Sequence, residues 1–234
     1  MNMLQVDSLA HMQTQMLENM LDGMPGDILF ISGWAGYKPL FPVLSRQTTF
    51  VCPFNPESGE SLEAELEKYW DIIIAWSLGA HLCLKNISRL RAGRLVLLAP
   101  FLDFCHGSSW QKVQKMIHGL EKNPETTLGW FWKLCGMRPI PDTPALNIHD
   151  LQQGLRFLLK SKVDCMSLET HLPINIVHGL KDKIVPVSQS EAIRECLPHS
   201  SFHTETCGHF IPEQVIFRTL CGLRAQSFHR QFHE

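Results

Sequence analysis

Residues 71–81, DIIIAWSLGAH, constrain the fold more than any other stretch of the chain. The apolar run at 72–76 predicts a buried strand, and the segment from Leu78 onward is compatible with a helix. A serine on a tight turn between strand and helix needs small residues two positions before and after it, because the two backbones come close together there. Ala75 and Gly79 meet that need. The pattern therefore predicts a nucleophile elbow with Ser77 raised clear of the sheet.

The size and charge of the chain exclude several classes of protein. With 234 residues, of which 44% are hydrophobic, the chain can bury a full core, and we expect a single domain over residues 1–234. A net charge of -2 without a basic tract argues against nucleic-acid binding. No uninterrupted apolar run reaches about 18 residues, so no membrane span is expected. The segment 1–22 has no lysine or arginine and does not resemble a secretory signal.

The eight cysteines are dispersed along the chain and form no C-x-x-C pair. Without an export signal, this spacing favours reduced thiols in a cytoplasmic protein with neither metal nor cofactor. Cys83 and Cys207, the cysteines nearest to the candidate site residues, are interpreted as packing residues, because no neighbour that would stabilise a thiolate is evident.

Apolar strands alternate with segments of helical length along most of the chain. Wholly apolar strands that alternate with helices are typical of a parallel sheet covered on both faces, so an α/β fold is expected. Strands are predicted at 27–32, 47–52, 72–76, 95–98, 174–177 and 201–206, and helices at 8–21, 61–69, 78–90, 188–196 and 212–224.

Residues 101–170 interrupt this alternation. The stretch is rich in aromatic residues and contains a proline cluster at Pro139, Pro141 and Pro144. An insertion of this length after one strand is expected to form a helical lid above the carboxyl ends of the strands, where ligands bind in such sheets.

Two polar segments that follow predicted strands supply the partners that a serine nucleophile needs. Asp182 lies in HGLKDKIVP at 178–186, and His209 lies in CGHF at 207–210. A base and an acid that orients it are required, and the order Ser77, Asp182, His209 suits three loops that converge above one sheet. Asp103 also follows a strand and is the rival acid. His178 ends a strand and is interpreted as structural.

Together these segments resemble the α/β-hydrolase superfamily between about residues 27 and 224. Within it, the chain is most similar to the BioH-type pimeloyl-acyl-carrier-protein methyl ester esterases of biotin synthesis. The closer resemblance rests on Gly33-Trp34, on Trp76, on FWKL at 131–134, and on LQQGL at 151–155 leading to Val163-Asp164. The turn at 32–35 reads SGWA where the family usually has HGWG, and the opening strand pair of the family is missing or replaced by the helix at 8–21.

The resemblance implies a role for each candidate residue. Ser77 would be the nucleophile, His209 the base and Asp182 the residue that orients the base. The backbone N–H groups of Trp34 and Leu78 would form the oxyanion hole. The residues expected to bind substrate are Trp34, Trp76, Phe131, Trp132, Leu134 and His209.

The resemblance also implies an acyl carrier protein as partner, beside small ester substrates, and a monomeric enzyme. Residues 104–163 carry eight Lys and Arg against four Asp and Glu. A basic lid would attract an acidic carrier, and its expected docking residues are Lys112, Lys115, Arg156 and Lys160. An ordinary solvated helix surface would have the same composition. The lid aromatics likewise suit either simple packing or a channel for a methylene chain.

Three functions remain open on the sequence alone. The first is hydrolysis of the pimeloyl-carrier methyl ester through an acyl-serine intermediate. A short-chain carboxylesterase or acyl thioesterase of broad specificity would have the same three residues. A binding protein with an inactive hydrolase fold is a different class, although such relatives commonly lose one of the three.

Overall fold

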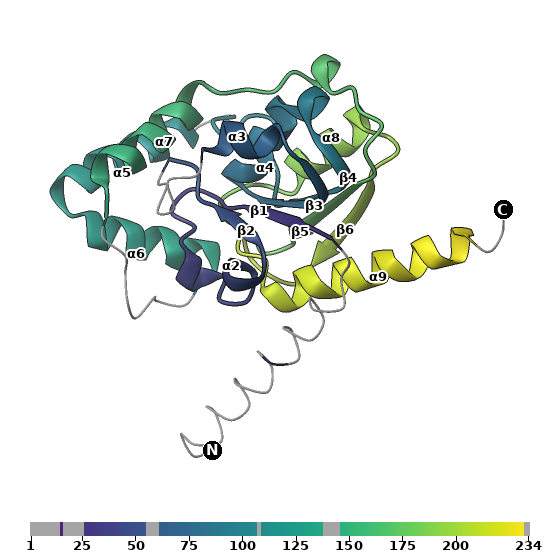
Figure 1. Cartoon of the computed structure of the whole chain (residues 1–234). Helices are drawn as coiled ribbons and strands as arrows, with labels where there is room; N and C mark the ends of the chain where they lie inside the picture. The colour runs from purple at the N-terminus through teal and green to yellow at the C-terminus, as the bar shows by residue number, and fades with distance from the viewer. Residues whose placement is uncertain (1–14, 16–25, 55–60, 107–108, 138–145, 232–234) are drawn as a thin grey trace.

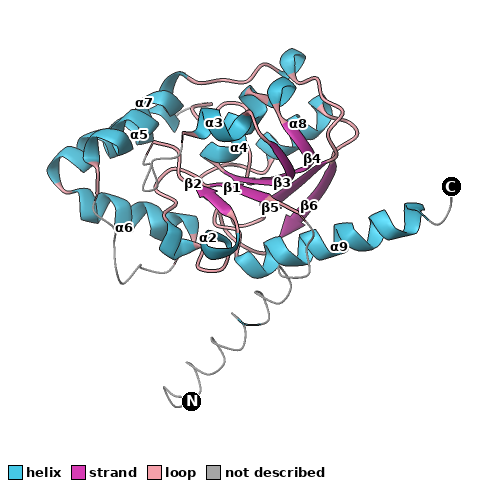
Figure 2. Ribbon diagram, viewed as in Figure 1, coloured by secondary structure: helices cyan, strands magenta, loops and turns pink. Residues whose placement is uncertain are grey.

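The computed structural model describes residues 15, 26–54, 61–106, 109–137 and 146–231, with side chains described as far as residue 222. Its centre is a six-stranded parallel sheet in the order β2-β1-β3-β4-β5-β6 (Figures 1 and 2). The strands are β1 (Ile28–Ile31), β2 (Thr49–Val51), β3 (Tyr69–Trp76), β4 (Arg91–Leu98), β5 (Ile174–Gly179) and β6 (Ser201–Glu205). The predicted parallel α/β sheet is confirmed.

The strand order places the candidate residues at the carboxyl ends of the strands. From β1 the chain moves outward to β2, and then returns past β1 to β3 and onward in the opposite direction. Loops after β1 and β3 therefore diverge at the carboxyl ends of these neighbouring strands, which is where open α/β sheets bind ligands. Gly33 follows β1 and Ser77 follows β3 at this position.

Helices cover both faces of the sheet, because the strands are apolar on both sides. On one face α3 (Leu62–Leu66), α4 (Leu78–Lys85) and α8 (Ser188–Cys196) pack over Leu29, Ile73 and Leu95. On the other face α2 (Leu44–Gln47) and α9 (Glu213–Gln231) pack over Phe30, Ile74 and Val96. Figure 1 shows α9 extending beyond the sheet toward the C-terminus. No helix in the described ranges is long and apolar enough to cross a membrane.

Three α-helices lie between β4 and β5 in the described residues, where the sequence predicts an insertion. It contains α5 (Ser109–Lys122), α6 (Pro124–Cys135) and α7 (Ile148–Lys160), which lie together beside the sheet (Figure 2). Val113, Leu128 and Leu151 join its helices to the core cluster that includes Trp34 and Trp76. The insertion is therefore packed against the loops that follow β1 and β3.

Several element boundaries differ from those predicted. β3 begins at Tyr69 and β4 at Arg91, where Tyr69 pairs with Arg91 at an exposed end of the sheet. Asp71 in β3, and Arg91 and Arg94 in β4, interrupt the apolar runs. The sequence prediction therefore missed these strand starts and extended the helix at 61–69 too far. The helix after Ser77 ends at Lys85 and is followed by the 3-10 turn η2 (Ile87–Arg89). The predicted helix at 8–21 lies, apart from Gln15, outside the described residues.

The prediction that the cysteines are reduced is wrong for one pair. Cys165, in the 3-10 turn η3 (Cys165–Ser167), forms a disulfide with Cys196 at the end of α8, and their Cα atoms are 5.4 Å apart. The two residues are 31 positions apart in sequence. The pairing follows from the β5–α8 connection, which returns α8 alongside η3, and spacing along the chain does not indicate it.

Candidate active site

The elbow at Ser77 has the geometry that the sequence predicts. Ser77 has φ 53° and ψ -111°, a conformation that a non-glycine residue adopts only when its surroundings impose it. Its N–H donates to the carbonyl oxygen of Leu98 at 2.8 Å, and its own carbonyl accepts from the N–H of His81 at 2.9 Å. The turn is thus fixed to β4 on one side and to α4 on the other.

Gly79 is required by the close approach of α4 to β1. A Cβ atom at this position would overlap the carbonyl oxygens of Ile31 and Ser32, which are backbone atoms that cannot rotate away. We expect Gly79→Ala to lower the free energy of unfolding by at least about 3 kcal/mol, since the elbow has to shift. Chemical denaturation measures this change.

Gly129 provides the matched control for Gly79. It also lies in a helix, but a Cβ atom there meets nothing within 4 Å. We expect Gly129→Ala to stabilise the protein by about 0.5–1 kcal/mol through helix propensity. Equal effects of the two substitutions would contradict the close approach at the elbow.

His209 joins the serine to the acid. Its Nε2 lies 2.7 Å from Ser77 Oγ, and its Nδ1 lies 2.7 Å from Asp182 Oδ2. A carboxylate only accepts, so Nδ1 carries the proton and Nε2 is free to accept the proton of the serine hydroxyl. This is the tautomer that a general base needs. The structure therefore brings together the three residues predicted from separate strand ends.

Backbone and side-chain donors hold Asp182 in position. Its Oδ1 accepts from the N–H groups of Ile184 at 2.7 Å and Val185 at 2.9 Å. His178 Nε2 lies 3.4 Å from Oδ2 and donates to the carbonyl of Val185 at 3.0 Å, which leaves Nδ1 to accept from Ser190 Oγ at 2.7 Å. Burial acts to raise the pKa of Asp182, but His209 and these hydrogen bonds outweigh it and hold the pKa well below its usual range. Asp182 is therefore ionised.

The rival acid Asp103 lies elsewhere. Its Oδ2 is 2.8 Å from Lys162 Nζ, and its Oδ1 accepts from the N–H of Cys105 at 2.9 Å. The structure places Asp182, and not Asp103, against His209. His178, which the sequence suggested was structural, contacts the same carboxylate.

The loop after β1 lies directly beside the serine. A Cβ atom on Gly33 would come within 3.1 Å of Ser77 Cβ and 2.8 Å of the Trp76 ring, so only glycine fits here. The next residues are Trp34 and Ala35, and Ala35 has φ 53°. Among the described hydrogen bonds, the N–H groups of Trp34 and Leu78 have no acceptor. Both remain available for the predicted oxyanion hole.

Helices of the insertion hold this loop from two sides. Trp34 Nε1 donates to the carbonyl of Leu151 in α7 at 2.8 Å, and the Trp34 ring meets Phe131 of α6 edge-on with centroids 4.7 Å apart. Trp132 Nε1 donates to the carbonyl of Ala35 at 3.1 Å. Three of the predicted substrate-binding residues, Trp34, Phe131 and Trp132, thus form one contact between insertion and loop.

The other predicted substrate-binding residues have different surroundings. Trp76 is buried and its Nε1 donates to the carbonyl of His209 at 2.8 Å, so it supports the loop of the base. Leu134 is half-buried in α6. Their contact with substrate remains a prediction.

The candidate base and nucleophile are covered in this structure. His209 is 0% exposed and Ser77 is 6% exposed. The N–H of Phe210 donates to the carbonyl of Cys135 at the end of α6, and a Cβ on Gly208 would press on the same carbonyl. The sequence contains no signal for this contact between α6 and the loop of the base.

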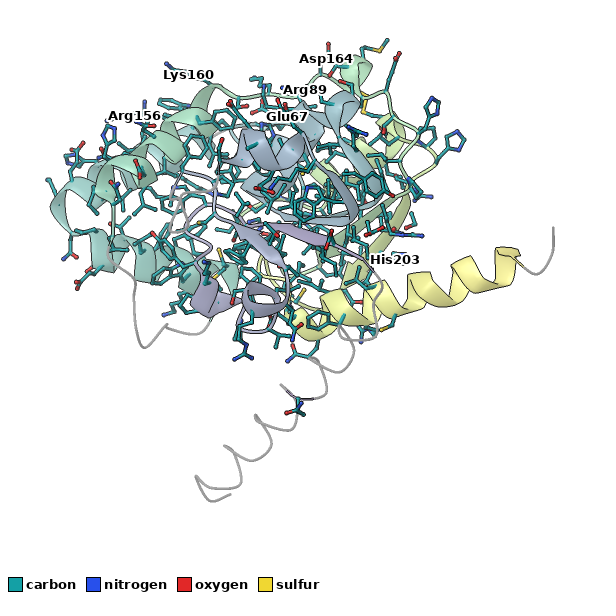
Figure 3. All side chains as sticks on the ribbon, viewed as in Figure 1. Glu67, Arg89, Arg156, Lys160, Asp164 and His203 are labelled. Carbon is teal, nitrogen blue, oxygen red and sulfur yellow. A yellow bond between two sulfur atoms is a disulfide. The ribbon has the colours of Figure 1, made fainter. Side chains whose placement is uncertain are left out.

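The four predicted docking residues are all exposed on helices of the insertion. Lys112 and Lys115 lie on α5, and Arg156 and Lys160 lie on α7. Figure 3 shows Arg156 and Lys160 on the outer side of α7. None of the four forms an ion pair with another described residue. Their charges are therefore directed to solvent.

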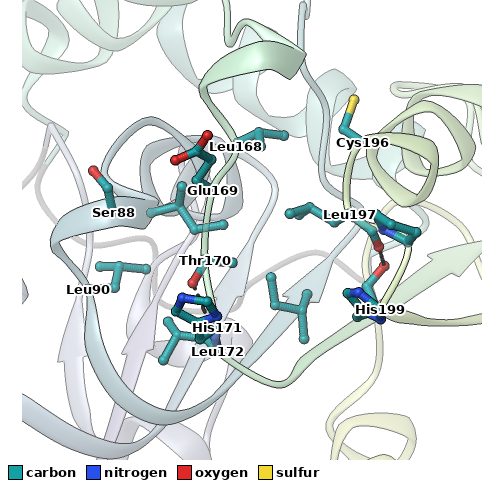
Figure 4. A pocket seen from close by; sticks show the side chains of 14 residues that line it. Ser88, Leu90, Leu168, Glu169, Thr170, His171, Leu172, Cys196, Leu197 and His199 are labelled. Carbon is teal, nitrogen blue, oxygen red and sulfur yellow. Dashed lines mark hydrogen bonds between the residues drawn. The ribbon is translucent and has the colours of Figure 1, made fainter.

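A cavity of about 740 Å³ lies at the amino ends of β4, β5 and β6, away from the candidate site (Figure 4). Leu90, Ile174 and Leu197 contribute apolar side chains to it, and His171 and His199 stand at its rim. It contains none of the predicted site residues. Within the described part of the chain, no three His, Cys, Asp or Glu side chains are placed to hold a metal ion.

The parallel sheet, the elbow after β3 and the helical insertion after β4 define the α/β-hydrolase fold. No model of a known protein family matches the sequence, and no curated protein matches it. Solved structures agree with the fold. An esterase from Exiguobacterium antarcticum is similar with a TM-score of 0.64 at 15% identity, over 85% of this chain and 91% of the esterase.

Two further solved structures show the same fold at similar distance. A structure from a study of carboxylesterases of Nitrososphaera gargenis is similar to this chain with a TM-score of 0.63 at 11% identity. The similarity covers 88% of this chain and 92% of the other. BioG from Haemophilus influenzae has a TM-score of 0.56 at 16% identity, covering 79% of this chain and 88% of BioG. At these identities the likeness concerns the fold alone, and the BioH-type resemblance of the sequence is not resolved by it.

Proposed function

We propose that this protein is a serine carboxylesterase that acts through an acyl-serine intermediate. The observation that carries the proposal is the hydrogen-bonded series Ser77–His209–Asp182, with both bonds at 2.7 Å and the base in the required tautomer. The esterases among its structural neighbours add support at the level of the fold.

The first half of the reaction follows from the position of each atom. Ser77 Oγ attacks the ester carbonyl carbon as its proton moves to His209 Nε2. Asp182 stabilises the imidazolium, and the N–H groups of Leu78 and Trp34 donate to the developing oxyanion. When the carbon–oxygen bond to the alcohol breaks, His209 returns the proton to the leaving alcohol.

The second half repeats these steps with water. His209 takes a proton from a water molecule, whose oxygen attacks the acyl-serine, and then gives that proton back to Ser77 Oγ. The products are one carboxylic acid and one alcohol. No proton is gained or lost by the three residues over the full cycle.

The leading substrate in this proposal is the methyl ester of pimeloyl-acyl carrier protein. The sequence resemblance to BioH-type esterases suggests it, and the exposed cations on α5 and α7 suit an acidic carrier. Docking of the carrier would hold its thioester away from Ser77 and present the methyl ester at the other end of the acyl chain. The enzyme would then release methanol and leave the thioester intact.

The test compares two esters on wild type and a charge-reversed variant. In Lys112→Glu/Lys115→Glu/Arg156→Glu/Lys160→Glu, we expect kcat/KM for the carrier-bound ester to fall at least about 100-fold through lost steering. Hydrolysis of nitrophenyl butyrate should remain near the wild-type rate, because the four side chains are exposed and none of them forms a described hydrogen bond or ion pair with Ser77, His209 or Asp182. Released methanol and the mobility of the carrier report the first reaction.

The controls separate the alternatives. Wild type that hydrolyses the nitrophenyl ester but not the carrier-bound ester would indicate a broad carboxylesterase. Release of free carrier thiol would indicate a thioesterase. Failure of a fluorophosphonate to label wild-type Ser77, together with no turnover of either ester, would leave a binding protein with a hydrolase fold.

A further inference from the structure

The two ends of the helical insertion meet at a short paired segment, here called the neck, which comprises residues 101–105 and 161–163. Asp103 and Lys162 form an isolated antiparallel bridge, and the N–H of Val163 donates to the carbonyl of Leu102 at 2.9 Å. The neck is the covalent connection of α5, α6 and α7 to the sheet, in addition to their direct contacts with the loops beside Ser77. The orientation of the neck therefore affects where the insertion lies.

A buried histidine on the elbow helix contacts both sides of the neck. His81 Nδ1 lies 3.0 Å from the carbonyl oxygen of Phe101, and its Nε2 lies 2.8 Å from Ser161 Oγ. Since a carbonyl only accepts, Nδ1 donates, and Nε2 accepts from the serine hydroxyl. The imidazole also stacks on Phe101 with centroids 4.7 Å apart and an interplanar angle of 17°.

The same histidine is connected directly to the nucleophile. His81 lies one turn after Ser77 in α4, and its N–H donates to the Ser77 carbonyl at 2.9 Å. Burial, together with the charge of Lys85, lowers the pKa of His81 to about 4 and outweighs the carbonyl contact of Phe101 and the charge of Asp103, which raise it. The imidazole is therefore neutral at neutral pH and can serve as donor and acceptor at once.

A second contact ties the neck to the helix after the acid loop. Gln189 Oε1, on α8, accepts from the N–H groups of Leu102 at 2.9 Å and Asp103 at 3.2 Å. This side chain holds only one side of the neck. Lys85, at the end of the elbow helix, donates to the carbonyl of Lys162 at 3.4 Å and so also reaches one side only. Among the described residues of that helix, only His81 forms hydrogen bonds with both sides of the neck.

We infer that His81 is a positioning residue that holds the helical insertion in its covering position over Ser77. The inference rests on the proposed function. By this inference, the elbow helix both presents Ser77 and fixes the insertion. Helices α6 and α7 of the insertion in turn hold Trp34 beside Ser77. Loss of the His81 contacts should let the insertion move away from Ser77 more often.

The direction of the expected effect distinguishes positioning from mere support. In His81→Leu both contacts are lost, and we expect a fluorophosphonate to label Ser77 about fivefold faster, the factor that corresponds to about 1 kcal/mol of conformational free energy. His81→Asn keeps a donor near Phe101, and Ser161→Ala removes only the other contact, so both should give smaller increases. KM for a long acyl ester should rise in the same order.

The control is Leu197→Ala, which removes a buried side chain beside the cavity at the amino ends of the strands. It should lower thermal stability without accelerating the labelling. If Ser77 in His81→Leu is labelled no faster than in wild type, as expected for Leu197→Ala, then His81 only supports the core. That result would overturn the inference.

Hydrogen exchange keeps this test independent of catalysis. In His81→Leu, backbone amides of α7 should exchange faster, while those of β5 keep their wild-type rates. If wild-type Ser77 does not react with the fluorophosphonate, the proposed function fails, and the exchange rates alone decide the role of His81. Unchanged exchange in α7 would overturn the inference.

Discussion

Ser77→Ala is expected to lower kcat for ester hydrolysis by about 10⁵- to 10⁶-fold and to abolish covalent labelling by a fluorophosphonate. The substitution removes the oxygen that lies 2.7 Å from His209 Nε2 and leaves His209 and Asp182 in place. Only an oxygen atom is lost, so the protein should keep its thermal stability. Initial rates of ester hydrolysis measure kcat. Mass spectrometry of the protein after treatment with the fluorophosphonate measures the covalent label.

Ser88→Ala is the matched control for this variant. Ser88 is exposed and borders the cavity at the amino ends of the strands. It should keep both the turnover and the label of wild type. Label that persists on Ser77→Ala would show that another residue reacts, and turnover that persists would remove the serine from the mechanism.

Asp182→Asn is expected to lower kcat by about 10⁴-fold with little change in fold. The single side-chain oxygen of the asparagine would accept from the N–H groups of Ile184 and Val185, which lie 2.7 and 2.9 Å from Asp182 Oδ1. Its amide nitrogen would then face His209 Nδ1 and donate to it. That exchange places the imidazole proton on Nε2, where it blocks acceptance of the serine proton.

Asp103→Asn separates the two acids that the sequence left open. Its loss of an ion pair with the exposed Lys162 should cost at most about 1 kcal/mol, since such surface pairs contribute little. The amide oxygen can still accept from the N–H of Cys105. Most of the activity should remain. Initial rates that fall more in Asp103→Asn than in Asp182→Asn would assign the acid to Asp103.

The sequence predicted that Ser77, Asp182 and His209 lie together, as the structure has them, because the signals for these positions are local. Small residues around Ser77 and polar residues after apolar strands are visible in a single chain, and parallel strands bring their carboxyl ends to one edge without further information. The strand starts at Tyr69 and Arg91 were missed because exposed ends of strands need not be apolar.

Contacts between distant segments could not be predicted in this way. Trp34 and Leu151 are 117 positions apart, and their hydrogen bond depends on how α7 packs against the loop after β1. The contacts of His81 with the neck could not be predicted either, since nothing in its neighbours along the chain indicates them. The Cys165–Cys196 bond depends likewise on the return of α8.

The disulfide between Cys165 and Cys196 encloses part of the candidate site in a covalent ring. The ring contains β5, the loop of Asp182 and α8, but neither Ser77 nor His209. In the chain-entropy view, a disulfide that closes 31 residues raises the free energy of the unfolded chain by about 3–4 kcal/mol, because it reduces the conformational entropy of that chain. The acid therefore resides in a segment whose stability follows the thiol–disulfide balance around the protein, whereas the nucleophile and the base reside outside it.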